Sequence, residues 1–288
     1  MGNYYCMMTG LPDIKLDSKL EVSYAALREE LDSALSDNDK KLMEYFFLET
    51  DCKNLVRILK NPEAAIEVVG NYSKEELQDL IASALEMEDY IVPGFPAFMS
   101  KFVRSYNYNK DKEGFFAEDE IMLAFYEYAQ RCPNATIRDW YYLNQDINNI
   151  LTAFIARKYG WNVGDLIKGE NDVTEMIRIN TSKDFNLSRE YDHVNALMQI
   201  VDCEDPVDKE KRIDALKWLW LDNKTFFDSF SIEAVFAYFC KVAMLIRWDK
   251  LDVEKGQATF RQIIEDLRGE ATVPEEFTTY MPKGASKS

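Results

Sequence analysis

Residues 45–55 read YFFLETDCKNL, and residues 140–150, located 95 positions later, read WYYLNQDINNI. The two stretches share three identical residues at identical spacing: Leu48, Asp51 and Asn54 in the first, and Leu143, Asp146 and Asn149 in the second. Aromatic or aliphatic residues also stand at the equivalent flanking positions. We interpret the match as an internal duplication of a helical segment. Chance similarity between two amphipathic helices is the alternative.

Each copy places its polar pair in the same position on a helical wheel. At about 100° per residue, an apolar stripe runs along one face of each helix. Asp51 and Asn54 lie at the edge of the first stripe, and Asp146 and Asn149 lie at the edge of the second. A carboxylate or an amide in such a place is unfavourable unless it is hydrogen-bonded. We therefore expect each pair to bind a neighbouring loop, a helix N-terminus or an arginine.

The rest of the chain also has the punctuation of helices. Ser18–Glu21 and Ser73–Glu76 match the capping box that begins a helix, whereas Pro93–Pro96 cannot continue one. The duplicated stretches belong to expected long helices at 39–60 and 134–158. Other helices are expected at 97–108, 117–131, 189–201, 207–222, 231–249 and 252–268. This pattern predicts an all-α fold, a multi-helix funnel or an arrangement of repeated helical subdomains.

Two short segments are candidates for extended structure. Asn3–Leu11 is a short apolar run that ends at Pro12, and Met176–Asn180 is a weaker case. Periodicity alone does not assign such short runs. The duplication divides the chain into a first helical subdomain at 1–92, a second that repeats it at 93–185, a C-terminal helical part at 186–269 and a loose tail at 270–288.

Composition excludes several classes of partner. The 288 residues include 51 acidic and 34 basic side chains, which gives a net charge of −17. Such a surface repels phosphate backbones and anionic lipid headgroups, so we expect no nucleic acid binding. The most apolar segment, Ala234–Trp248, contains Lys241 and is too short to span a bilayer, so we expect no direct membrane insertion. Five dispersed cysteines without a CxxC pair indicate reduced thiols in the cytosol.

The sequence contains no signature of a reactive site. It has no HExxH, EF-hand, GxxxxGK[ST], GxGxxG or GxSxG motif. The single histidine, His193, is expected to be a surface or packing residue. We predict that the chain is not an enzyme and has no catalytic residues, metal site or cofactor. An enzyme that uses carboxylates from the acidic helices remains an alternative, which a deep pocket lined by converging carboxylates would favour.

Aromatic residues crowd the last third of the chain and the second duplicated stretch. Their spacing suits packing between helices, but tryptophan, tyrosine and arginine are also favoured anchors of protein interfaces. The candidate interface residues are Trp140, Tyr141, Arg247 and Trp248.

The opening residues 3–13, NYYCMMTGLPD, resemble the start of an uncharacterised bacterial protein family encoded among the subunits of V-type ATP synthases. The resemblance continues through LETDCKNLVRIL, DWYYLNQDINNIL and AMLIRWDKLDVEKG. That family is typical of gene clusters in which a recognisable C-type stalk protein is missing. The C-type protein, whose eukaryotic counterpart is the d-type, is similar more coarsely: it is an all-helical funnel of repeated domains with acid-then-amide patterns. A third copy is not clear here, because Ala234–Trp248 lacks an Asp-x-x-Asn.

The resemblance implies a non-catalytic subunit that links the central stalk to the membrane rotor ring of a bacterial V-type ATP synthase. It also implies partners, which are the rotor ring and the central-stalk subunits, and a cytoplasmic location. The chain would be peripheral at the inner face of the membrane, bound there through these proteins. The second hypothesis is a general cytosolic helical adaptor or scaffold that binds other proteins. The carboxylate-dependent enzyme is the third.

Overall fold

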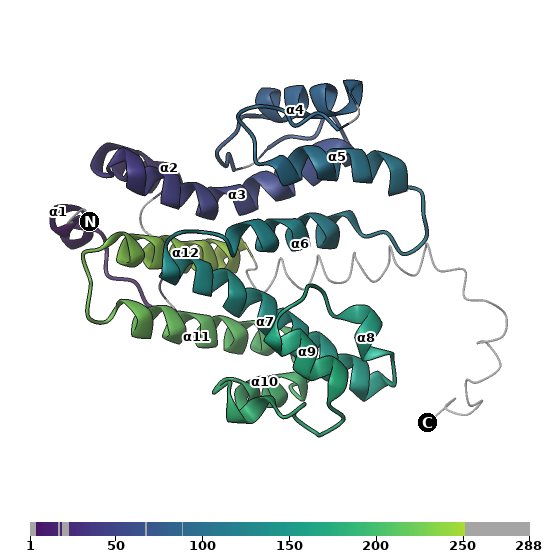
Figure 1. Ribbon diagram of the computed structural model, residues 1–288. Helices are drawn as coiled ribbons and strands as arrows, with labels where there is room; N and C mark the ends of the chain where they lie inside the picture. Colours follow the sequence, from purple (N-terminus) through teal and green to yellow (C-terminus); the bar gives the residue numbers. More distant parts are fainter. Residues whose placement is uncertain (1–3, 17, 19–22, 67, 88, 251–288) are drawn as a thin grey trace, which may run out of the picture.

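The computed structural model describes residues 4–250, apart from positions 17, 19–22, 67 and 88. Within these residues the chain forms twelve α-helices, one 3₁₀ turn and no strand, so the predicted all-α class is confirmed (Figure 1). The elements are α1 (Tyr5–Gly10), α2 (Tyr24–Ala34), α3 (Asp37–Lys60), α4 (Lys74–Glu86), α5 (Ala97–Asn109), α6 (Ala117–Ala129), α7 (Ala135–Tyr159), α8 (Val163–Leu166), α9 (Asp172–Ile179), η1 (Leu187–Arg189), α10 (Val194–Val201), α11 (Pro206–Thr225) and α12 (Ile232–Lys250).

The two duplicated stretches lie in the two longest of these helices, α3 with 24 residues and α7 with 25, as predicted. Ser36 caps the start of α3, and Asn134 caps the start of α7; each side chain accepts a backbone N–H from the first turn. Gly160 ends α7 in the left-handed conformation, with φ of 72°. Among the helices of the described residues, none has the length and apolar character needed to cross a membrane.

A large hydrophobic core joins the first half of the chain to its last described helix. α3 packs against α6, and α12 contacts both α3 and α7. Phe47 of α3, Phe125 of α6, Tyr141 of α7 and Phe236 of α12 are all buried in this core. α12 therefore completes a core that α3 begins, although the two helices stand near opposite ends of the described sequence.

A smaller core surrounds the second half of α7. Ile150 and Phe154 of α7 pack there with Ile177 of α9 and Leu197 of α10. α11 contacts both α10 and α12, so it connects the two cores, and Figure 1 shows α8, α9 and α10 grouped around the end of α7. α7 thus contributes its first half to the large core and its second half to the small one.

Both candidates for extended structure are wrong. Residues 5–10 form α1, which is anchored by the bond from Tyr4 N–H to the Phe230 carbonyl at 2.8 Å and by the buried Met7. Residues 176–179 belong to α9, which begins after its cap at Asn171. Runs this short take their conformation from the helices that they pack against, which sequence periodicity does not reveal.

The helix boundaries differ from prediction at two places. α2 is capped by Ser23, and the Ser18 hydroxyl instead accepts the Lys15 N–H, so the predicted capping box at Ser18 is wrong. The predicted box at Ser73 is confirmed, with both of its reciprocal bonds present. The helix expected at 189–201 begins only at Val194, because η1 precedes it. The helix expected at 252–268 and the predicted tail lie outside the described residues.

Candidate functional site

Asp51 is buried in α3 and binds the loop that follows the helix. Its Oδ2 accepts the Asn71 N–H at 2.8 Å, and its Oδ1 accepts the Tyr72 N–H at 3.2 Å. Gly70 lies directly against the carboxylate, since a Cβ at that position would stand 2.0 Å from Asp51 Oδ1. The absence of a side chain at residue 70 therefore allows the loop to approach close enough for both bonds.

Asn54, almost one turn further along α3, binds the same loop. Its Nδ2 donates to the Val68 carbonyl at 2.9 Å. Asp51, Asn54 and residues 68–72 together form what we call the first latch. The first latch holds the loop onto α3 and ends at Ser73, the cap of α4.

The second duplicated stretch makes a corresponding set of contacts. Asn149 donates from Nδ2 to the Lys168 carbonyl and accepts the Lys168 N–H at Oδ1, both at 2.9 Å. Asp146 Oδ1 accepts from Asn171 Nδ2 at 2.7 Å. We call Asp146, Asn149 and residues 168–171 the second latch. It holds the loop onto α7 and ends at Asn171, the cap of α9.

The two latches give the duplication a structural counterpart: in each copy the acid and the amide bind the loop after the long helix. They differ in the bond made by the acid. Asp51 binds backbone N–H groups, as expected, but the expected backbone or basic partner of Asp146 is wrong, because its partner is the Asn171 amide. The cause lies in the capping residue. Asn171 caps with its oxygen and keeps its amide nitrogen for Asp146, whereas Ser73 has no such donor.

Burial sets the protonation of both acids. It raises the pKa of Asp51 from 3.8 to about 6, although the bonds from Asn71 and Tyr72 act in the opposite direction. It raises the pKa of Asp146 to about 6 as well, opposed by the bond from Asn171 and reinforced by the nearby charge of Asp172. Both latches thus contain a carboxyl group that is easier to protonate than an exposed one.

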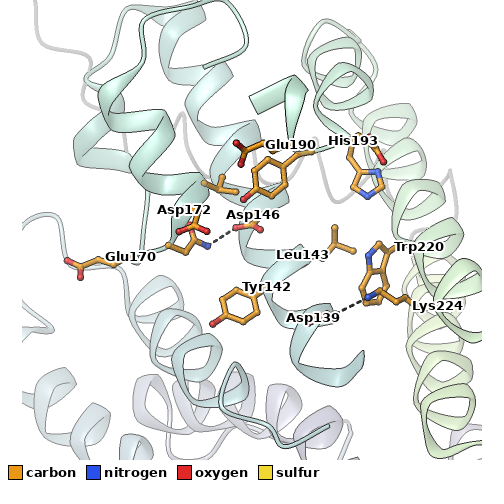
Figure 2. Close-up of a pocket in the computed structure, with 14 residues that line it drawn as sticks. Asp139, Tyr142, Leu143, Asp146, Glu170, Asp172, Glu190, His193, Trp220 and Lys224 are labelled. Carbon is orange, nitrogen blue, oxygen red and sulfur yellow. Dashed lines mark hydrogen bonds and ion pairs between the residues drawn. The ribbon is translucent and has the colours of Figure 1, made fainter. Parts of the chain in front are cut away.

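A pocket of about 610 Å³ opens beside the second latch, between α7, α9 and α11 (Figure 2). Six carboxylates line it: Asp139, Asp146, Glu170, Asp172, Glu190 and Asp192. Tyr142 of α7 and Trp220 of α11 supply aromatic surface, and His193 also lines the pocket. This acidic pocket therefore combines negative charge with aromatic faces, a lining that favours cationic groups.

The carboxylates surround the acidic pocket and do not converge on one point. Lys224 Nζ lies 2.9 Å from Asp139 Oδ2, and Asp146 is bonded to Asn171; dashed lines in Figure 2 mark both contacts. Within the part of the chain that the structure describes, no three His, Cys, Asp or Glu side chains are grouped so that they could hold a metal ion. The arrangement suits a distributed charge better than a single small cation.

The sequence model of one protein family, described as "Protein of unknown function (DUF2764)", matches residues 1–271. The chain belongs to this family. No curated protein and no solved structure matches it. The DUF2764 match extends over both latches and the acidic pocket, so all of this geometry lies within the matched residues.

Two of the candidate interface residues of this DUF2764 member lie in the large core. Trp140 is 7% exposed and Tyr141 is 1% exposed. The Tyr141 hydroxyl donates to the Tyr45 carbonyl at 2.8 Å, and its ring meets Phe125 edge to face. Trp140 packs against Trp220, which lines the acidic pocket. The packing interpretation fits both positions, and neither side chain is available as a surface anchor.

The other two candidates, Arg247 and Trp248, bind one buried acid on α11. Arg247 donates to Asp214 Oδ2 at 2.5 Å, and Trp248 Nε1 donates to the same oxygen at 2.8 Å. Arg247 also contacts the exposed Glu210 at 3.0 Å. Asp214 is 2% exposed, so its carboxylate ties the end of α12 to α11.

Sequence reasoning missed several residues of these sites. Asp214 stands 33 residues before Arg247, and nothing in the spacing connects them. The loop glycines carried a usable signal, because Gly70 precedes Asn71 directly and Gly169 precedes Asn171 by two residues. Gly169 has φ of +82°, and a Cβ there would stand 2.3 Å from Gln145 Nε2. A glycine shortly before an asparagine thus recurs in both copies where the loop meets the helix.

Proposed function

We propose that the chain is a non-catalytic component of a bacterial V-type ATP synthase, similar to its C-type stalk protein and linking the central stalk to the membrane rotor ring. The sequence resemblance supports this proposal and covers most of the chain, including both latch helices. The proposal places the protein in the cytoplasm, peripheral at the inner face of the membrane. It would be bound there through the rotor ring and the central-stalk subunits.

The pair of latches is the observation that carries the proposal. Each latch holds a loop onto a long helix through bonds to Asp51 and Asn54 or to Asp146 and Asn149. Opening a latch would strand buried polar groups, at a cost of about 1–3 kcal/mol for each group. Each helix and its loop therefore move as one body. Proteins that transmit torque need such units, because a loose loop would absorb the displacement.

A deletion strain tests the proposal. Inverted membrane vesicles from cells that lack the gene should hydrolyse ATP at the catalytic head but fail to couple hydrolysis to ion transport. A plasmid copy of the wild-type gene should restore coupling. Normal coupled pumping in the deletion strain would overturn the proposed link between stalk and ring.

Co-purification separates this proposal from a general helical adaptor. A tagged copy at native expression level should be recovered from solubilised membranes with rotor-ring and central-stalk subunits. Recovery with other cytosolic proteins and without these subunits would favour the adaptor.

The acidic pocket favours a second candidate, an enzyme that uses carboxylates. Asp146 lines the pocket, and its pKa of about 6 would let it exchange a proton near neutral pH. The purified chain can be incubated with a mixed metabolite library and followed by mass spectrometry. Conversion of a compound that is lost in Asp146→Asn and kept in an exposed control, Asp111→Asn, would support this candidate. Absence of conversion would count against it.

A further inference from the structure

An exposed apolar strip lies at the end of α11. Leu219 is 59% exposed, and Phe226 and Phe227 are 73% and 95% exposed. Two adjacent phenylalanine side chains are rarely this exposed, and contiguous apolar surface of this kind marks sites of protein contact. Phe226 keeps helical angles, with φ of −57° and ψ of −41°, so the strip continues the line of the helix.

The strip adjoins the acidic pocket along the same helix. Trp220 and Lys224 line the pocket from α11 at a spacing of four residues, and Phe227 follows at a spacing of seven from Trp220. Residues at i, i+4 and i+7 share one helix face. Leu219 and Phe226, themselves seven residues apart, run beside this face. Apolar and acidic surface are therefore neighbours over about two helical turns, or roughly 10 Å.

The charge of the acidic pocket is largely uncompensated. Its lining has six carboxylates and one lysine, and that lysine, Lys224, is bonded to Asp139. Glu190 and Asp192 are both exposed or partly exposed at the rim. A ligand with positive charges would be attracted here, whereas a phosphate backbone, an anionic membrane or a second copy of a chain with net charge −17 would be repelled.

We propose that the strip and the acidic pocket together form a docking surface for a basic amphipathic helix of another protein. Apolar side chains two turns apart on that helix would cover Leu219, Phe226 and Phe227. Lysine or arginine side chains on its adjacent face would enter the acidic pocket, where Tyr142 and Trp220 offer aromatic faces. This inference goes beyond the proposed function, and it holds whether or not the partner belongs to an ATP synthase.

The test uses a synthetic probe, a fluorescein-labelled amphipathic helix of about five turns made of leucine and lysine. Its binding to the full chain is measured by anisotropy at two salt concentrations. Phe227→Ser and the double variant Glu190→Gln/Asp192→Asn should each weaken binding by about tenfold, since a few central anchors dominate such contacts. The charge variant should also reduce the dependence on salt, because salt screens exposed charges.

Matched controls at the turn between α5 and α6 separate a docking surface from general attraction to an acidic protein. Tyr108→Ser removes an aromatic that is 77% exposed, and Asp111→Asn/Glu113→Gln removes two exposed charges. These variants should change binding less than about twofold. Equal effects of the two sets would overturn the proposal, and so would binding weakened only by Phe227→Ser. Self-association in sedimentation that Phe227→Ser abolishes would also overturn it, because the occupant would then be a second copy.

Discussion

Replacing Gly70 by alanine tests whether the first latch depends on close approach of its loop. A Cβ at residue 70 would lie 2.0 Å from Asp51 Oδ1, whereas ordinary contact begins at 3.4 Å. Because Asp51 is completely buried, the loop has to move away by about 1.4 Å, which stretches the bonds from Asn71 and Tyr72 beyond bonding distance. Hydrogen bonds to a charged acceptor contribute about 1.5–3 kcal/mol each, so with partial relaxation we expect a loss of about 2–4 kcal/mol.

A double-mutant cycle measured by urea unfolding isolates this effect. Asp51→Ala alone should cost about 1–3 kcal/mol, because two loop N–H groups lose their acceptor. Gly70→Ala should then cost less than about 1 kcal/mol in the Asp51→Ala background, since the obstacle is gone. Gly164→Ala is the control, because its Cβ would meet only Asn162 Oδ1 at 3.6 Å. Equal losses from Gly70→Ala in both backgrounds would refute the reasoning.

Three further predictions address the acids and the missing nucleotide motifs. The pKa of Asp51 is raised when the chain folds, so its contribution to stability is greatest below about pH 4 and is lost as the pH rises through about 6. The difference in unfolding free energy between wild type and Asp51→Ala should accordingly fall by up to about 3 kcal/mol from about pH 4 to about pH 7, and a rise would contradict the sign. Asp214→Ala should cost about 1–3 kcal/mol in urea unfolding, against less than about 1 kcal/mol for Glu210→Ala, which contacts Arg247 from the surface. Calorimetry should detect no micromolar ATP binding, and such binding would show that the chain holds nucleotide without any of the known motifs.

The helical framework was predictable because its signals are local. Ser36 and Asn134 stand where caps are needed, and the long helices α3 and α7 follow them. The edge positions of Asp51 and Asp146 on their apolar stripes led to the expectation of bonded partners. Local signals of this kind depend on neighbours within a few turns, so one sequence is enough to read them.

The acidic pocket and the Asp214 contact were not predictable because they depend on how distant helices pack. The pocket brings Asp139 of α7 together with Lys224 of α11, which is 85 residues away in sequence. Trp140 illustrates the same limit. Its aromatic character fits both an interface anchor and a core residue, and only the position of Trp220 against it decides between them. Tertiary contacts of this separation leave no periodic trace in a single sequence.

The two duplicated helices are also joined to each other, which bears on how the chain would carry a load. Tyr141 of α7 donates to the Tyr45 carbonyl of α3, so the hydroxyl of the second copy binds the backbone of the first. α12 contacts both helices, and Asp214 ties the end of α12 to α11. Sliding of one latched unit past the other would break the bond at Tyr141 and open the core around it. The latches therefore stiffen each unit and these contacts stiffen the pair, so that a force applied to α3 reaches α7 without being absorbed in a loop.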